Sequence, residues 1–289
     1  MTRFGVSIVP SASGRSDPVA EARLAEDLGF DLVSVWDHPA GERPSFETWT
    51  LLAWIAARTQ RIGLTTNVLG LPFRLPALTA KMAETLDRLS GGRVTLGLGG
   101  GGNDREIAGL GAPSRTPGEK VEALEEALEI IRGVWTRPRF SFEGRHYRTD
   151  DASIEPKPAR PIPIWLGTYG TLALGLTGRL ADGWIPSMPY LPPRVARSRM
   201  NVVRAAADRA GRDPGALDYA YNVGVRVGGA PPDDPERYVA GPPDEVIERL
   251  LELIEIGFSV LNLWLGGRRE EQLQRTGAEV LPALRGIAG

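Results

Sequence analysis

An aspartate and a histidine stand side by side in the segment Trp36-Asp37-His38-Pro39, directly after a short apolar run. A histidine at the end of a strand can polarise a bound molecule or accept its proton, because imidazole titrates near neutral pH. The structural alternative is an aspartate that caps the following loop and a histidine hydrogen-bonded to the backbone. Adjacent side chains on an extended chain point to opposite faces, so the two residues need not act together. We name Asp37 and His38 as candidate catalytic residues and keep both interpretations open.

A run of glycines, Gly97-Leu98-Gly99-Gly100-Gly101-Gly102, matches the glycine spacing of dinucleotide-binding loops. In those loops a helix begins at once and directs its amino end at a pyrophosphate. Here residues 103–117 continue through polar residues, glycine and proline, which disfavours that interpretation. Because glycine lacks a Cβ, the run would let a large flat molecule approach the backbone, and a merely flexible loop is the alternative. We expect Gly99, Gly100 and Gly101 to line a cofactor site.

A second glycine turn, Gly167-Thr168-Tyr169-Gly170-Thr171, lies between a predicted strand and a predicted helix. Backbone N–H groups at the start of a helix, with threonine hydroxyls nearby, suit a phosphate group. An ordinary turn in which Thr171 caps the helix is the alternative. The candidate cofactor-binding residues of this turn are Gly167, Thr168, Tyr169 and Gly170.

Composition excludes several kinds of site and partner. The 289 residues include no cysteine and two histidines, which rules out disulfides and thiolate metal sites and leaves too few imidazoles for a typical zinc site. We expect no metal, although a site made of carboxylates alone stays open. A net charge of -2 gives no reason to expect nucleic acid or an anionic membrane as partner. No apolar run reaches the roughly 18 residues of a membrane span, and the amino terminus lacks a signal-peptide pattern, so we expect a cytoplasmic protein.

Short apolar or β-branched runs alternate with segments of helical period, which is the pattern of βα units around a parallel sheet. The predicted strands are 4–9, 32–35, 62–66, 94–98, 162–166, 183–185, 217–225 and 260–264. The predicted helices are 19–28, 46–58, 75–89, 118–135, 171–181, 193–210, 244–256 and 270–284. Eight such pairs fit one closed (β/α)8 barrel, a TIM barrel of the α/β class, in a single domain over residues 1–289.

Two insertions interrupt this predicted alternation. Residues 99–117 follow strand four, and residues 136–161 follow helix four and include a predicted hairpin that turns at Glu143 and Gly144. In a barrel of this kind the chemistry lies at the carboxyl ends of the strands. Both glycine turns and the Asp37-His38 pair fall there, as do Ser187 and either Asn222 or Asn262.

Four blocks carry a further signal, namely FGVSIVP, AEDLGFDLVSVWDH, TQRIGLTTNVLGLPFRLPALTAKMAETLDRLSGGRVTLGLGGG and IPIWLGTYGTLALGLTGRLADGWIPS. Together they resemble the luciferase-like monooxygenase superfamily, the flavin- and deazaflavin-dependent (β/α)8 barrels, over nearly the whole chain. The resemblance implies an oxidoreductase or monooxygenase that acts on a small-molecule substrate. It also implies a homodimer formed through the second and third helices, to which Trp49 and Trp54 would contribute.

The resemblance assigns roles to individual residues as well. The segment Thr65-Thr66-Asn67-Val68 corresponds to a bulge at which the deazaflavin branch has a non-prolyl cis peptide against the cofactor ring, so Asn67 and Val68 are expected to bind cofactor. The block VSVWDH is similar to the branch that includes F420-dependent glucose-6-phosphate dehydrogenase, in which the matching Asp-His pair lies beside the reactive ring. That dehydrogenase carries a glutamate within Gly-Thr-Gly-Glu after strand four. Gly102 stands there in this chain, which argues against oxidation of glucose 6-phosphate.

Two cofactors agree with this resemblance and differ in chemistry. F420 passes a hydride at C5, whereas reduced FMN binds oxygen at C4a and oxygenates a substrate. The resemblance of the block that contains Trp36-Asp37-His38 favours F420 and hydride transfer. An FMN-dependent monooxygenase is the alternative, and a barrel that binds a flavin or another ligand without catalysis is a third.

Overall fold

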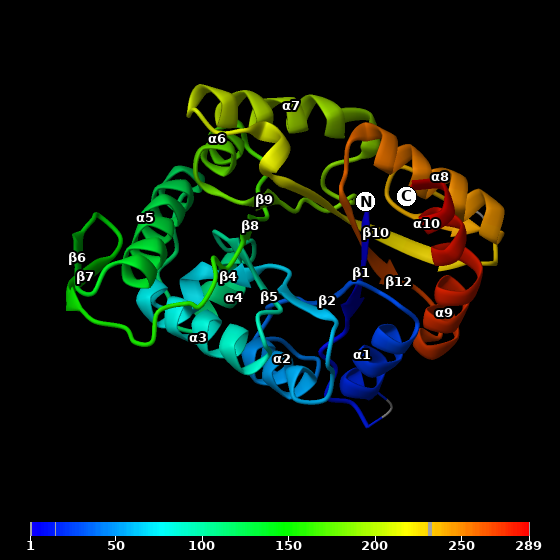
Figure 1. Cartoon of the computed structure of the whole chain (residues 1–289), viewed down its shortest axis with the longest axis horizontal. Coiled ribbons are helices and arrows are strands. Elements are labelled where there is room, and N and C mark those ends of the chain that lie inside the picture. The colour runs from blue at the N-terminus through cyan, green and yellow to red at the C-terminus, as the bar shows by residue number, and fades with distance from the viewer. Residues whose placement is uncertain (1, 15, 231–232, 289) are drawn as a thin grey trace.

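Parallel strands close into a barrel in the computed structural model, which describes residues 2–14, 16–230 and 233–288 (Figure 1). Its eight strands follow the order β1 (Arg3–Ile8), β2 (Leu32–Val35), β3 (Gly63–Thr66), β5 (Val94–Gly99), β8 (Ile164–Leu166), β9 (Gly183–Trp184), β10 (Asp218–Val227) and β12 (Val260–Leu265). β12 pairs in turn with β1, with Val6 opposite Leu263, and this pairing closes the ring. The predicted (β/α)8 barrel is confirmed.

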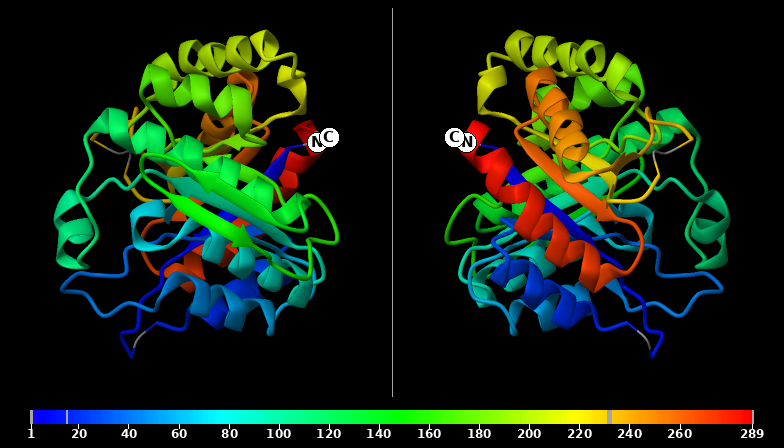
Figure 2. Two further views of the ribbon diagram at one scale, coloured as in Figure 1. Left: turned by 90° about the vertical axis from the view of Figure 1, so that its left-hand side faces the viewer. Right: turned by 90° about the vertical axis from the view of Figure 1, so that its right-hand side faces the viewer.

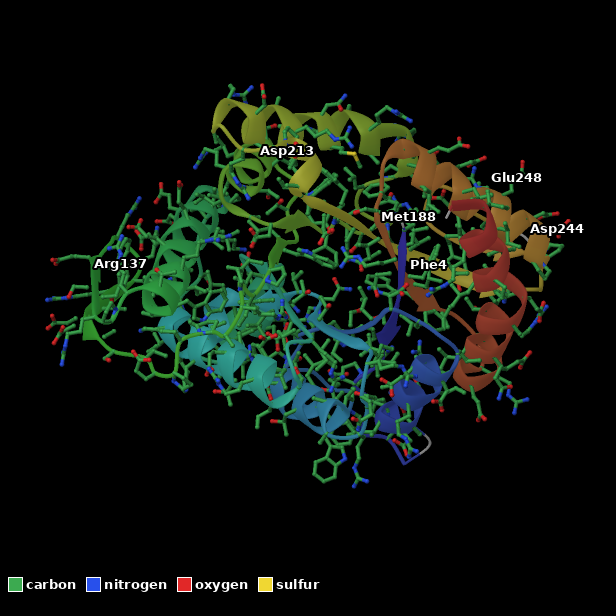
Figure 3. The ribbon with its side chains drawn as sticks, viewed as in Figure 1. Phe4, Arg137, Met188, Asp213, Asp244 and Glu248 are labelled. Carbon is green, nitrogen blue, oxygen red and sulfur yellow. The ribbon has the colours of Figure 1, made fainter. Side chains whose placement is uncertain are left out.

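Helices cover the outside of the barrel. They are α1 (Pro18–Asp27), α2 (Thr48–Ala56), α3 (Pro76–Leu89), α5 (Pro117–Thr136), α6 (Thr171–Leu180), α7 (Pro193–Arg209), α8 (Pro243–Ile256), α9 (Arg269–Arg275) and α10 (Leu281–Ala288). On α8 the buried residues recur every three or four positions, as at Val246, Leu250 and Leu253, which places them on one side of the helix. Asp244 and Glu248 lie on the exposed side (Figure 3). This division fixes which face of the helix meets the sheet.

Several short elements were not predicted from the sequence. β4 (Leu69–Gly70) pairs with β5, and β11 (Val239–Gly241) pairs with β10. Two 3-10 turns, η1 (Leu71–Phe73) and η2 (Pro214–Ala216), join longer elements. The helix predicted over 270–284 is present as continuous helical backbone, and the π-helical turn η3 (Thr276–Val280) within it, between α9 and α10, was not predicted. Within η3, a Cβ on Gly277 would lie 2.9 Å from Cβ of Leu28, so the turn packs closely on the end of α1.

The two insertions differ in how well they were predicted. The first insertion, residues 99–117, contains a short helix that was not predicted, α4 (Asp104–Gly109), which buries Ile107. The hairpin of the second insertion is confirmed as β6 (Phe140–Glu143) paired antiparallel with β7 (Arg148–Ala152). It lies beside α5 (Figure 1), where the carboxylate of Glu126 accepts the backbone N–H groups of residues 145–147.

Side chains alternate along the barrel strands between two separate cores. Those that face outward, such as Phe4, Val6 and Ile8 of β1, join the large core beneath the helices. A smaller set that faces inward forms a second cluster, made of Leu32, Trp165, Ile185, Ala220 and Val260. This second cluster fills the amino-terminal part of the barrel, so the space for chemistry lies toward the carboxyl ends of the strands.

The last helix is tied to the first βα unit. Figure 2 shows α10 beside β1, and the guanidinium of Arg285 on α10 donates to the carbonyl oxygen of Gly29 at 2.6 Å and to Asp31 Oδ2 at 3.0 Å. Its Cζ also lies 5.9 Å from the ring centre of Phe4 on β1. These contacts join the first and last elements of the chain in the helical layer, as the pairing of β1 with β12 joins them in the sheet.

A close contact between α6 and α7 provides a test of the packing. A Cβ on Gly178 of α6 would overlap the carbonyl oxygen of Val203 on α7 and lie 2.7 Å from Ala206 Cβ, whereas Gly175 on α6 has open space. We therefore expect Gly178→Ala to lower the free energy of unfolding in urea by about 1–3 kcal/mol. Gly175→Ala, the matched control, should leave it unchanged or raise it by up to about 1 kcal/mol. Equal effects of the two substitutions would contradict the packing described.

Candidate active site

Asp37 and His38 follow β2 and diverge at the carboxyl end of the barrel. The side chain of Asp37 is wholly buried, and its Oδ2 accepts the N–H of Gly70 at 2.8 Å and Nη1 of Arg74 at 2.7 Å. A second nitrogen of Arg74 donates to the other carboxylate oxygen at 3.1 Å. Asp37 therefore anchors β4 and the turn after it, and it does not contact the imidazole of His38 in the structure.

Arg74 extends this anchor to the start of α2. Its Nη2 donates to Oε1 of Glu47 at 2.6 Å, and Glu47 also caps α2 by accepting the N–H groups of Trp49 and Thr50. Burial raises the pKa of Glu47, but the hydrogen bonds from Thr50, Trp49 and Arg74 outweigh it and hold the pKa below its usual value. For Arg74 the directions are reversed. Burial lowers its pKa, but the two carboxylates outweigh burial and hold the pKa above its usual value. The two carboxylates thus share one guanidinium behind the rim of the barrel.

His38 pairs with a carboxylate that the sequence analysis did not name. Its Nδ1 lies 2.8 Å from Oε2 of Glu106 on α4, and Oε1 of Glu106 accepts the N–H of Ala40 at 3.0 Å. The Glu106 side chain is 4% exposed, whereas that of His38 is 60% exposed. Asn103 three residues earlier caps α4, and this Asn-x-x-Glu spacing is the sequence signal that predicts a helix start here. The imidazole is therefore held on one edge and accessible on the other.

The peptide bond between Asn67 and Val68 is cis, as predicted. The side-chain amide of Asn67 points into the barrel and exchanges two hydrogen bonds with that of Asn222, at 2.7 and 3.1 Å. A Cβ on Gly99 would lie 2.8 Å from Cγ2 of Val68, and one on Gly167 would lie 3.0 Å from the same atom. Val68 therefore fills space that these two glycines leave open.

Gly100 and Gly101 of the first run also face protein atoms, whereas a Cβ on Gly102 would meet no atom within 4 Å. A Cβ on Gly100 would lie 3.2 Å from Lys120 Cβ, and one on Gly101 would lie 2.7 Å from Ile107. Gly101 also has a φ of 89°, which disfavours a side chain. The expected reason for the glycine run, open room for a flat molecule, is thus not what surrounds these positions. Cofactor binding by Gly99, Gly100 and Gly101 stays a prediction.

A layer of neutral polar side chains crosses the barrel beneath Asn67. Asn262 donates to the side chains of Asn222 and Ser34 at 2.7 and 2.9 Å, and Asn222 donates to Ser187 at 3.1 Å. All of these side chains are buried. The strand-end candidates Ser187, Asn222 and Asn262 are thus brought together in one hydrogen-bonded layer, which forms the polar floor of the site.

The turn after β8 leads into α6, whose first residue is Thr171. Gly170 is the N-cap, no side chain caps this helix start, and a Cβ on Gly170 would meet no atom within 4 Å. The alternative in which Thr171 caps the helix is therefore wrong. The hydroxyl of Thr168 lies 2.7 Å from that of Thr177 and is buried, so the backbone of the turn, and not this hydroxyl, faces the open space.

Tyr169 of this turn lies at the rim. Its hydroxyl accepts the N–H of Ser187 at 3.1 Å, and its ring packs edge-on against Tyr190 with 5.9 Å between ring centres. Burial raises the pKa of Tyr169, so the phenol is neutral at physiological pH. The contact joins the turn after β8 to the segment after β9.

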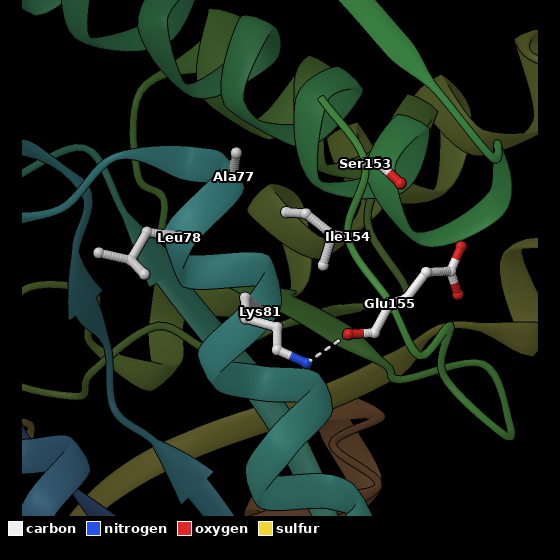
Figure 4. Close-up of a pocket in the computed structure, with 6 residues that line it drawn as sticks. All are labelled: Ala77, Leu78, Lys81, Ser153, Ile154 and Glu155. Atoms are coloured by element: carbon white, nitrogen blue, oxygen red, sulfur yellow. Dashed lines mark hydrogen bonds between the residues drawn. The ribbon is translucent and has the colours of Figure 1, made fainter. Parts of the chain in front are cut away.

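A shallow depression of about 340 Å³ lies on the outer surface, between α3 and residues 153–155 (Figure 4). Lys81 lines the depression, and its ammonium group donates to the carbonyl oxygen of Glu155 at 2.8 Å. The lining contains no histidine, so we place the candidate site at the carboxyl end of the barrel and not here. Among the described residues no group of three or more histidine, aspartate and glutamate side chains could hold a metal ion, and no helix is long and apolar enough to cross a membrane.

Comparison with known proteins gives relatives that align over nearly the whole of both chains. The chain is 30% identical to the F420-dependent glucose-6-phosphate dehydrogenase of Nakamurella multipartita, over 99% of this chain and 98% of that protein. It is 31% identical to the enzyme of the same name from Intrasporangium calvum, over 99% and 100% of the two chains.

Solved structures have the same fold at lower identity. An F420-dependent secondary alcohol dehydrogenase, solved with an F420-acetone adduct, is 21% identical and superposes with a TM-score of 0.89 over 98% of this chain and 99% of the other. The F420-dependent tetrahydromethanopterin reductase of Methanopyrus kandleri is also 21% identical, with a TM-score of 0.84 over 98% and 99%. The sequence model of the luciferase-like monooxygenase family matches residues 1–237. With that match and with relatives 30–31% identical over nearly the whole chain, the chain belongs to the luciferase-like monooxygenase family.

Proposed function

We propose that the protein is an oxidoreductase that uses F420 for hydride transfer to or from a small organic substrate. The observation that carries the proposal is the exposed imidazole of His38, which lies at the same end of the barrel as Asn67, Val68 and the uncapped start of α6. Relatives 30–31% identical over nearly the whole chain are named as F420-dependent dehydrogenases, which supports F420 over FMN.

The residues present fit a cofactor that carries phosphate. The amino end of α6 bears a partial positive charge, and the space beside Gly170 is open. We propose that the backbone of residues 167–170 holds the phosphate and that Asn67 and Val68 contact the ring. When bound, F420 accepts or releases a hydride at C5.

The protein's own groups have distinct tasks in this proposal. His38 holds or releases a proton at Nε2, the ring nitrogen that does not face Glu106. Asp37 is a positioning residue, because Gly70 and Arg74 occupy its carboxylate. The buried amide layer keeps Asn67 in place. Gly102 offers no carboxylate, so the proposal does not extend to glucose 6-phosphate, and steady turnover of that sugar phosphate would contradict this limit.

We further propose a homodimer formed through α2 and α3. The exposed apolar side chains on these helices support it, with Trp54 on α2 58% exposed and Leu78 on α3 52% exposed. Trp49 is buried, so of the two tryptophans expected at this surface only Trp54 is available. A solution mass equal to the 31.2 kDa of one chain would exclude the dimer.

Binding of the cofactor can be tested at the start of α6. Parallel titrations with F420 and FMN should show tighter binding of F420. Gly170→Asp places a carboxylate at an N-cap, which stabilises the helix but repels phosphate, so we expect F420 affinity to fall about tenfold or more with unchanged folding. Gly170→Asn, the neutral control, caps equally well and should weaken binding less. Equal losses with both variants would contradict a phosphate here, and tighter binding of FMN would favour the monooxygenase alternative.

The role of His38 can be tested by truncation. We expect His38→Ala to slow single-turnover reduction of bound F420 by about 10²–10⁴-fold, because a general acid or base contributes on that order. Affinity for F420 should change far less, since the proposed contacts come from residues 67–68 and 167–170. His146→Ala, which removes the other histidine in the hairpin, is the control. A rate unchanged by His38→Ala would make His38 a structural residue.

A further inference from the structure

We propose that Glu106 is a positioning residue that fixes the tautomer of His38. Its carboxylate accepts the Nδ1–H of the imidazole and thereby leaves Nε2 as the atom that takes up and releases a proton. The catalytic use of Nε2 rests on the function proposed above, whereas the tautomer is a property of the protein alone.

With Glu106 ionised, the hydrogen-bond distances leave one assignment of donors and acceptors. Oε1 of Glu106 accepts the N–H of Ala40 at 3.0 Å, and this backbone group can only donate. Oε2 of the same carboxylate lies 2.8 Å from Nδ1 of His38. An ionised carboxylate can only accept, so the proton between the two residues must be carried by Nδ1. Neutral imidazole has one N–H, and Nε2 is then free to accept.

Charge and burial indicate that the Glu106 carboxylate serves to hold the imidazole of His38. The Glu106 side chain is 4% exposed, and the ion pair found for it among the described residues is with His38. Neighbouring carboxylates have other cations, since Asp37 pairs with Arg74 and Asp104 pairs with Lys120 at 2.6 Å. A buried carboxylate without lysine or arginine costs stability unless its hydrogen bonds are well made. Here both of its oxygens serve the segment that carries His38.

The loop after β5 determines where Glu106 lies. Gly101 has a φ of 89° and leaves room for Ile107 of α4, which is buried. Asn103 then caps α4 by accepting the N–H of Glu106 at 3.3 Å. The glycine-rich turn and this cap together set the short helix against the end of β2, with the Glu106 carboxylate at the imidazole.

The isosteric variant Glu106→Gln gives a defined expectation. Because the N–H of Ala40 needs an acceptor, the amide oxygen of glutamine takes the place of Oε1. The amide NH2 group then faces Nδ1 of His38 and donates to it, so Nδ1 must become the acceptor. The proton moves to Nε2, and the imidazole tautomer is inverted without a change in side-chain size.

The tautomer can be read directly by NMR because the chain has two histidines, His38 and His146. Long-range ¹H–¹⁵N spectra of the ¹⁵N-labelled protein, at a pH that keeps both rings neutral, distinguish protonated from unprotonated ring nitrogens. His146→Gln assigns the remaining signals to His38. We expect an Nδ1–H tautomer in the wild type and an Nε2–H tautomer in Glu106→Gln.

Glu84→Gln is the matched control for loss of a buried carboxylate. Glu84 is 2% exposed and pairs with Lys81 and Arg88 on α3, without contact to a histidine. It should leave the His38 signals unchanged. A wild-type ring with Nε2–H, a rapid average of both tautomers, or an unchanged tautomer in Glu106→Gln would each overturn the proposal.

Turnover provides a second, separate readout. Glu106→Gln should slow single-turnover reduction of F420 on the order of 10²-fold with little change in F420 affinity, because the inverted ring cannot accept a proton at Nε2. In a His38→Ala background the same substitution should have no further effect. If the NMR result holds and no F420 turnover is found, the proposed function fails and the positioning role stands. If the tautomer does not respond to Glu106→Gln, the positioning role fails whatever the activity.

Discussion

The site depends on one buried layer of hydrogen bonds across the inside of the barrel. Asn222 is its centre, since its amide bonds to Asn67 on one side, to Asn262 on the other and to Ser187 above β9. Removing a partner from such a layer leaves a buried amide unpaired, at a cost of about 1–3 kcal/mol. The layer therefore links the inward faces of β2, β10 and β12 to the segments that follow β3 and β9.

Side chains along β2 and the residues after it alternate between two directions, and this alternation separates supporting residues from the candidate catalytic one. Asp37 and His38 are neighbours in sequence, but the carboxylate of Asp37 is buried against Arg74 and the imidazole of His38 is exposed. The same alternation turns Leu32 and Ser34 inward and Val33 and Val35 toward the helices. A histidine two positions beyond Trp36 thus continues the inward row of β2, which is why it reaches the mouth of the barrel.

How well these features could be predicted depends on how far apart in the sequence the interacting residues lie. Strands and helices were predicted because their apolar periods are local, and so was the hairpin, whose turn residues are adjacent. The pair His38–Glu106 spans 68 residues and the pair Asn67–Asn222 spans 155, so no local pattern joins either of them. Gly99 shows a second limit of prediction from the sequence. A glycine indicates that another group approaches the backbone closely but does not identify that group, which in the structure is Val68. The carboxyl-end candidates were found from strand order alone, but their partners required the fold.

Placing neutral amides inside the barrel and charges at its rim has an electrostatic consequence. Asn67, Asn222 and Asn262 satisfy one another without net charge, so the floor of the site adds no fixed charge beneath a bound molecule. The carboxylates of Asp37 and Glu47 share Arg74, which leaves the His38–Glu106 pair as the group whose charge can change. When the imidazole takes up a proton, that pair goes from one negative charge to none. The carboxylate and the imidazolium then face each other at hydrogen-bond distance, so neither charge is left unpaired at the edge of the barrel.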